Sequence, residues 1–257
     1  MRFKLFAGAV AGSVLLPAFA SAAVVPVVGS GYNQDLVVDN TATAGTDVSG
    51  TVTATMDAGT AKTGGTYYQT GFVTASPTTG LPAGTVVTSA TGNGTFALQP
   101  ANTNNAILLN NATPTGTFTL TTAARYNQLA IYGATGNGSG TITYTINFVD
   151  GATETGSFTS GDWFGGSPVA YTTAGRVNNV TTGATDSVGG TNPRVYEHLL
   201  TVSNTSANIQ SISFSRATAN GNTAVFAVSG NPVPEPGTVG LLAVAGLGLL
   251  ARRRARA

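Results

Sequence analysis

The sequence predicts an all-β protein, an antiparallel β-sandwich of jelly-roll-like kind with one apolar segment at each end of the chain. Two observations predict the strands. The 257 residues include 34 Gly and are rich in Thr, Asn and Ser, a composition that favours short strands joined by turns over long helices. Apolar and polar residues also alternate with a period of two in many short segments, which is typical of half-buried strands.

The first 22 residues have the three parts of a secretory signal peptide. Arg2 and Lys4 come first, an apolar run extends from Leu5 to Leu16, and the small residues Ala20 and Ala22 occupy the −3 and −1 positions of a cleavage site. We therefore expect a signal helix over residues 1–22, cleavage after Ala22, and export of the remaining chain.

The body over residues 23–230 is predicted to be one domain, and its clearest strand follows Gly140. Ile142, Tyr144, Ile146 and Phe148 share one face of this segment, while Thr and Asn residues share the other. Asp150-Gly151 then has the residue types of a tight hairpin turn, and Ala152–Phe158 forms the returning strand.

Ten shorter segments have similar patterns and are separated by turn residues, which predicts a two-sheet sandwich. A β-solenoid is an alternative, but the strand spacing is irregular and no repeat of about 20 residues recurs. The segments YNQLAIYG, TITYTINFVDG and GDWF between Tyr126 and Phe164 vaguely resemble jelly-roll modules of the galactose-binding-like type. The ten predicted strands are Val48–Met56, Tyr67–Thr74, Thr85–Ser89, Thr95–Leu98, Ala106–Leu109, Thr117–Thr121, Gln128–Tyr132, His198–Ser203, Ile209–Ser215 and Thr223–Val228.

The C-terminal segment over residues 231–257 combines a proline-rich stretch, an apolar run and a basic end. The uncharged run from Thr238 to Ala251 would reach about 21 Å as a helix, short of a hydrocarbon core of about 30 Å. The arginines that follow would stay in the cytoplasm and extend the span by snorkelling, so we expect a transmembrane helix with the body outside. These basic residues are Arg252, Arg253, Arg254 and Arg256.

The order of motif, apolar span and basic end in this segment resembles the PEP-CTERM sorting signal of Gram-negative bacteria that produce exopolysaccharide. The motif residues are Pro234, Glu235 and Pro236, within VPEPG. The two prolines favour an extended strand near the membrane, and Glu235 adds a charge to it. The resemblance implies recognition by an exosortase-type membrane protease, a transient stay in the inner membrane, and delivery of the body to the cell surface or extracellular matrix.

Composition excludes several other functions for the body. Between Ala23 and Val233 five cations stand against nine acids, a net charge of −4, which disfavours nucleic acid as a partner. With no cysteine and one histidine, His198, a zinc site is excluded, and His198 fits the edge of a strand better than a catalytic base.

Two sets of acidic residues are candidates for chemistry. Asp150, Glu154 and Asp162 are the close carboxylates of the second half, and a glycosidase pair would have to come from them or from one of them with a distant partner. Asp150 is better explained as a turn residue and Asp162 as a loop corner. A second group is a weak candidate for calcium, with no spacing that matches a defined calcium loop. This group comprises Asp35, Asp39 and Asp47.

The aromatic residues Trp163, Phe164 and Tyr171 are candidates for stacking against a sugar ring, although Trp163 is better explained as a plug at one end of the core. The leading hypothesis is an exported, non-enzymatic protein of the cell surface or matrix, associated with exopolysaccharide and without a cofactor. A carbohydrate-binding module of jelly-roll type is the alternative, and a glycoside hydrolase is a third hypothesis.

Overall fold

The computed structural model describes residues 23–73, 79–187, 192–219 and 221–234. In these ranges the chain is all-β, as the sequence predicts, with one helical turn, η1 (Ser49–Thr51). No helix in the described part of the chain is long and apolar enough to cross a bilayer. The signal helix expected over residues 1–22 and the helix expected over 238–251 lie outside the described residues.

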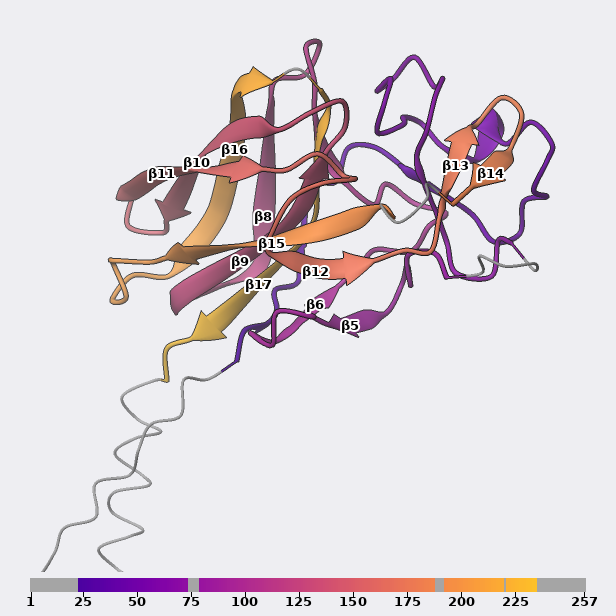
Figure 1. Cartoon of the computed structure of the whole chain (residues 1–257). Helices are drawn as coiled ribbons and strands as arrows, with labels where there is room; N and C mark the ends of the chain where they lie inside the picture. The colour runs from indigo at the N-terminus through magenta and orange to yellow at the C-terminus, as the bar shows by residue number, and fades with distance from the viewer. Residues whose placement is uncertain (1–22, 74–78, 188–191, 220, 235–257) are drawn as a thin grey trace, which may run out of the picture.

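A six-stranded antiparallel sheet forms the centre of the molecule (Figure 1). Five of its strands lie in the order β1, β17, β9, β15 and β12. The sixth strand, β7, also pairs with β17. The bounds of these strands are β1 Val25–Pro26, β7 Ile107–Leu109, β9 Tyr126–Thr135, β12 Val169–Thr172, β15 Arg194–Thr201 and β17 Thr223–Pro232.

A second antiparallel sheet has five strands in the order β11, β10, β16, β8 and β2. Asp150-Gly151 makes the turn between β10 and β11, as predicted. The Phe148 amide donates to the Ala152 carbonyl at 3.0 Å, and Gly151 has a φ of 85°, which glycine adopts most readily. The strands are β2 Gly29–Ser30, β8 Thr115–Ala124, β10 Gly140–Phe148, β11 Thr153–Ser160 and β16 Ile209–Ala219.

Three pairs of short strands lie outside the two large sheets. One pair is parallel and the other two are antiparallel. They are β3 (Val37–Val38) with β4 (Tyr67–Tyr68), β5 (Val86–Thr88) with β6 (Thr95–Ala97), and β13 (Arg176–Asn179) with β14 (Ala184–Asp186).

The two large sheets share one hydrophobic cluster. The five-stranded sheet contributes Phe118, Ile142, Ile146 and Phe214 among others, and all are at most 1% exposed. Residues of the six-stranded sheet complete the cluster, including Leu129, Ile131, Val225, Val228 and Leu200. Burial of this apolar surface is the main favourable contribution that holds the sheets together.

The opposite face of the six-stranded sheet is buried as well. Tyr132 and Phe226 point into a second cluster formed with the loops and short strands of the N-terminal half. Phe96 stacks on Tyr132 with ring centroids 4.1 Å apart, and Tyr67 meets Phe226 edge-on at 5.4 Å. The central strands β9 and β17 are therefore buried on both faces, which is why both are rich in apolar and small residues.

Eight of the ten shorter predicted segments lie in strands of the structure, several of which are longer than expected. The prediction of a strand over Val48–Met56 was wrong. Its alternating apolar residues are buried, but the chain there turns through η1, and the amides of Thr53 and Ala54 both donate to the Asp35 carbonyl instead of to a neighbouring strand. The strand expected from Tyr67 is limited to Tyr67–Tyr68, because a turn follows at Thr70.

Replacement of Phe118 by alanine tests the shared core. Phe118 is fully buried between the sheets, so Phe118→Ala should lower the free energy of unfolding by about 3–5 kcal/mol through lost burial and a cavity. Val28 is 73% exposed, and Val28→Ala should change it by less than about 0.5 kcal/mol. Urea unfolding followed by far-ultraviolet circular dichroism measures both, and equal effects would contradict the shared core.

Candidate functional site

Strand β17 carries the chain directly into the predicted sorting signal. Pro232 pairs with Tyr126, and the Val233 amide donates to the Arg125 carbonyl at 3.0 Å. The Tyr126 ring lies against Gly230, where a Cβ would come within 2.3 Å of a ring carbon, so this contact requires glycine. The fold thus holds the chain as far as Val233, past the expected domain boundary at residue 230.

Both ends of the described body lie next to each other. Val25 pairs with Gly230 and Pro26 with Ser229 in an antiparallel ladder, so β1 lies beside the last strand (Figure 1). Residue 23, where the chain would begin after signal-peptide cleavage, is therefore near the start of the sorting segment. Outside the described residues lie Ala20, Ala22, Glu235, Pro236, Arg252, Arg253, Arg254 and Arg256.

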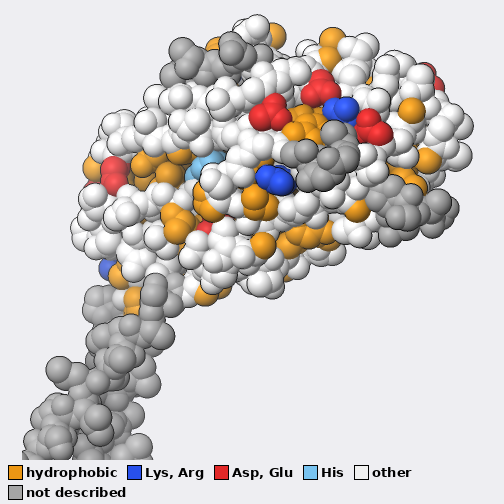
Figure 2. All heavy atoms as spheres, in the orientation of Figure 1, with side chains coloured by type: hydrophobic (Ala, Val, Ile, Leu, Met, Phe, Trp, Pro, Cys, Tyr) orange, Lys and Arg blue, Asp and Glu red, His pale blue; other side chains and the backbone are white. Residues whose placement is uncertain are grey.

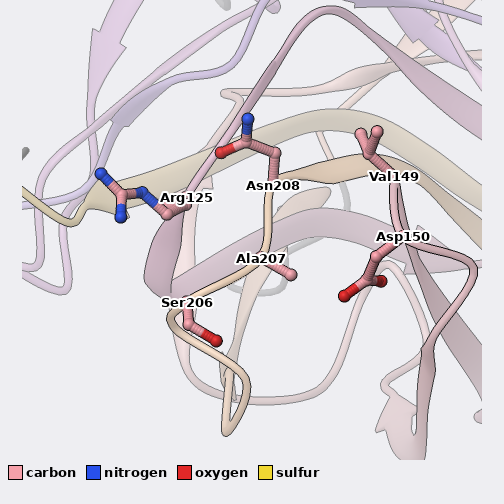
Figure 3. A pocket seen from close by; sticks show the side chains of 6 residues that line it. All are labelled: Arg125, Val149, Asp150, Ser206, Ala207 and Asn208. Carbon is pink, nitrogen blue, oxygen red and sulfur yellow. The ribbon is translucent and has the colours of Figure 1, made fainter.

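A groove of about 530 Å³ lies beside this exit (Figure 3). Arg125 and Asp150 are its charged residues, on separate loops, and they do not point toward each other in Figure 3. Glycoside hydrolysis by the usual mechanism needs two carboxyl groups that flank one bond. Only one of the predicted carboxylates, Asp150, lines this groove. The other lining residues are Val149, Ser206, Ala207 and Asn208.

Glu154 and Asp162 lie elsewhere and organise loops. Both oxygens of Glu154 accept from the Ser203 amide, at 3.1 and 3.0 Å. Asp162 accepts from the amides of Gly138 at 2.6 Å and Phe164 at 2.9 Å. Ser160 lies six positions after Glu154 along β11, which corresponds to about 20 Å of strand. The structure therefore does not bring these two carboxylates together.

Trp163 belongs to the core. Its side chain is 1% exposed, and its ring contacts Tyr67 at 5.1 Å and Phe164 at 4.7 Å between centroids. This burial agrees with the interpretation of Trp163 as a plug of the core, and it removes Trp163 from the candidates for stacking against a sugar. Phe164 is half-buried, and the Arg176 guanidinium lies 4.8 Å from its ring centre, so this face of the ring already has a cation against it. Tyr171 is half-buried and donates its hydroxyl to the Gly80 carbonyl at 3.1 Å.

Arg176 connects the aromatic pair to two acids. Its guanidinium lies 3.0 Å from Asp186 and 3.6 Å from Asp57, and it is 5.8 Å from the centre of the Trp163 ring. Burial raises the pKa of Asp57, and the Gly65 amide and Arg176 oppose this rise. Figure 2 shows acidic side chains gathered around one cation on an otherwise sparsely charged face. Sequence reasoning missed this group because its members are far apart along the chain.

The three weak calcium candidates do not converge. Asp35 is 8% exposed and accepts from Asn105 at 2.5 Å and from the Val37 amide at 3.2 Å. Asp47 is exposed and accepts from the Ser49 amide at 2.9 Å. Asp39 lies on the surface near Asp35, and its charge adds to the rise of the Asp35 pKa. The described part of the chain contains no group of three or more His, Cys, Asp or Glu residues that could hold a metal.

His198 and Glu197 are buried neighbours with structural partners. His198 stacks on Phe158 with centroids 4.5 Å apart, and burial lowers its pKa to about 4. Glu197 is fully buried and accepts from the Thr91 hydroxyl at 2.9 Å and the Asn93 amide group at 2.5 Å. This carboxylate fixes the Gly92–Gly94 turn against the sheet, a contact that sequence reasoning missed because 104 residues separate Asn93 from Glu197.

Comparison with known proteins identifies the C-terminal segment. Strand β17 leads into a segment that a protein-sorting signal matches, and this match marks the chain as an exported protein that is sorted through its C-terminal segment. The family model of the PEP-CTERM protein-sorting motif matches residues 232–254, and the chain therefore carries this motif. The match confirms the resemblance seen in the sequence. No curated protein matched the sequence.

Replacement of Arg176 by glutamine tests the group around Trp163, which is the only tryptophan in the chain and so reports on it by fluorescence. In the unchanged protein we expect blue-shifted emission that acrylamide quenches poorly. Arg176→Gln should shift the emission to longer wavelengths and lower the free energy of unfolding by about 1–2 kcal/mol, because two partly buried acids lose their partner. Arg125→Gln, in the groove, is the control, and unchanged emission in Arg176→Gln would contradict the assignment.

Asp35 predicts a pH dependence of stability. Burial raises its pKa to about 7 from 3.8, with the Val37 amide and Asn105 opposing and Asp39 adding to the rise. The folded protein holds a proton that the unfolded chain releases, so Asp35 should lower the free energy of unfolding by about 2–4 kcal/mol as the pH rises from about 4 to about 7. Asp35→Asn should abolish this contribution and be more stable than the unchanged protein above pH 7.

Urea unfolding at several pH values measures this effect as the difference between the two proteins. The difference in the free energy of unfolding between the two proteins is needed because His198 changes this free energy with pH in the opposite direction. Its folded pKa of about 4 lies below the unfolded value of 6.5, so its contribution is lost as the pH falls through the same window. Parallel stability curves for Asp35→Asn and the unchanged protein would contradict the assignment.

Proposed function

We propose that this chain is a non-enzymatic protein of the cell surface or extracellular matrix of a Gram-negative bacterium. The motif match at residues 232–254 carries the proposal, because it marks an exported protein sorted through its C-terminal signal. The precursor is held in the inner membrane by its C-terminal segment. An exosortase-type protease then removes this segment, and the body is delivered in association with exopolysaccharide.

The geometry at the end of the body supports this order of events. Within the described part of the chain, Val233 makes the last backbone hydrogen bond, and Pro234 and Pro236 of the motif follow in the sequence. Pro234 and Pro236 have no amide hydrogen to donate to a strand ladder. An extended segment next to a folded body is a form that a protease can bind.

The arrangement of the carboxylates supports a non-enzymatic body. Asp150 lines an open groove without Glu154 or Asp162, and those two acids accept backbone hydrogen bonds that hold loops. His198 is buried and stacks on Phe158, so its imidazole is not exposed at the surface to act as a base.

A carbohydrate-binding module of jelly-roll type is the second candidate. Two antiparallel sheets that contribute side chains to one hydrophobic cluster support this candidate, because a jelly-roll sandwich requires such a shared core. The sugar would not stack on Trp163, because this ring is buried. A polar surface of the body would have to bind it instead.

Variants of the tail test the sorting proposal. In cells that contain the protease, the unchanged protein should leave the membrane in a shortened form. Replacement of Pro234, Glu235 and Pro236 by alanine should lower the processed fraction at least tenfold, because the extended motif is lost. Replacement of Arg252, Arg253, Arg254 and Arg256 by glutamine should lower it by weakening the membrane orientation. Immunoblots of cell fractions measure both.

The control is a double variant, Pro100→Ala with Pro114→Ala, in exposed loops of the body. It should be processed like the unchanged protein. Full-length protein in the cytoplasm of cells with and without the protease would refute the proposal. So would an unchanged location and mass after deletion of residues 232–257.

A further inference from the structure

The outer face of the five-stranded sheet carries a regular array of short polar side chains. Strands β11, β10, β16 and β8 lie side by side, and their apolar residues point into the shared core. The alternate residues point to the other side. In the middle of these strands the pairing places Thr155 beside Thr145, Thr145 beside Ser213, and Ser213 beside Thr117. These four residues form the middle row of the array.

The row on one side of the middle row has the same composition. Ser157 pairs with Thr143, Thr143 with Ser215, and Ser215 with Thr115. The Thr143 hydroxyl donates to the Ser215 carbonyl at 3.1 Å, so this side chain is tied to the neighbouring strand.

The row on the other side joins Thr153, Asn147, Ser211 and Thr119. The Asn147 amide lies 3.1 Å from the Ser211 hydroxyl and 3.3 Å from that of Ser213, which links this row to the middle one. The middle row has its own contact, with the hydroxyls of Thr117 and Ser213 at 3.1 Å. The three rows together are called the hydroxyl face below.

The strand pairing makes the hydroxyl face continuous. The irregularities between β10 and β16 fall at Thr141/Ile142 and at Asn147/Phe148, and the one between β16 and β8 falls before Ser211. The three rows lie within the regular part of the ladders. Neighbouring side chains are therefore about 4.8 Å apart across strands and about 6.7 Å apart along each strand. None of these residues is buried.

The hydroxyl face contains neither a charged nor a large apolar side chain. An anionic polymer would find no cation on this face, and the body as a whole has nine acids against five cations. A second copy of the face would find no apolar surface to bury.

We propose that the hydroxyl face binds a neutral polysaccharide. Hydroxyl and amide groups both donate and accept hydrogen bonds, as sugar hydroxyls do, so the two surfaces can pair without charge. Short side chains on paired strands lose little conformational freedom on binding, and repeated weak contacts along one polymer add up. This inference rests on the proposed association of the body with exopolysaccharide and names the surface and the polymer class.

Adsorption to particulate polysaccharides tests the inference. The full chain, kept in mild detergent, is mixed with microcrystalline cellulose, with starch granules, or with calcium pectate beads as the anionic polymer. We expect retention on at least one neutral polymer that persists in about 1 M salt, where the Debye length falls to about 3 Å. The triple variant Thr117→Val, Thr145→Val and Thr155→Val should lower retention at least fivefold, since it removes three of the four hydroxyls of the middle row and keeps the side-chain shape.

Two further variants guard against a general effect on folding. Thr88→Val, Thr172→Val and Thr201→Val together change three exposed strand threonines outside the face and should leave retention unchanged. Thr155→Lys places a long charged side chain at the exposed edge strand β11, where lysine is tolerated, and should lower retention as the triple variant does. Circular dichroism checks that each variant is folded.

Several results would overturn the inference. These are no retention on either neutral polymer, retention only on pectate or only at low salt, and equal retention of the triple variant. A dimer that the triple variant converts to a monomer would identify the face as a contact between copies and would also overturn it. None of these results concerns the cellular location or the mass of the protein, so the sorting proposal stands or falls separately.

Discussion

Burial of the central sheet on both faces is the constraint on which the rest of the structure depends. Strands β9 and β17 contact the shared core of the two sheets on one side and the N-terminal loops on the other. A sheet covered in this way cannot tolerate a charged side chain without a partner, and the one carboxylate that it buries completely, on Glu197, is bound by Thr91 and Asn93. The same burial holds β17 in place at the end of the described chain.

The position of β17 connects the fold to the sorting signal. This strand pairs with β1 at the N-terminal end of the body and leads into the matched motif at residue 232. The segments before residue 23 and after residue 234 therefore join the body on adjacent strands. The pairing also means that the last residues before the motif are held by the sheet, so the signal begins close to the folded surface and not at the end of a long linker.

Many polar groups of the body make contacts that hold the fold together. Arg176 joins two acids and the Trp163 ring, Asp162 and Glu154 hold loops, and His198 stacks in the interior. The exposed polar residues of the five-stranded sheet differ from these, because they are uncharged, regular and turned to solvent. Several charged side chains of the body thus make internal contacts, and the hydroxyl face is left without charge.

The sequence alone determined the all-β class, most strands, the Asp150-Gly151 hairpin and the sorting motif, because each depends on local periodicity, turn residues or a short contiguous pattern. It did not show that Val48–Met56 would bond to the Asp35 loop, that Trp163 would be buried beneath Arg176, or which acids would lie together. The threonines of β10 were visible as one polar face, but their alignment with β8, β11 and β16 needed the register. These features join residues far apart in the chain, and only the packing of the two sheets brings such residues into contact.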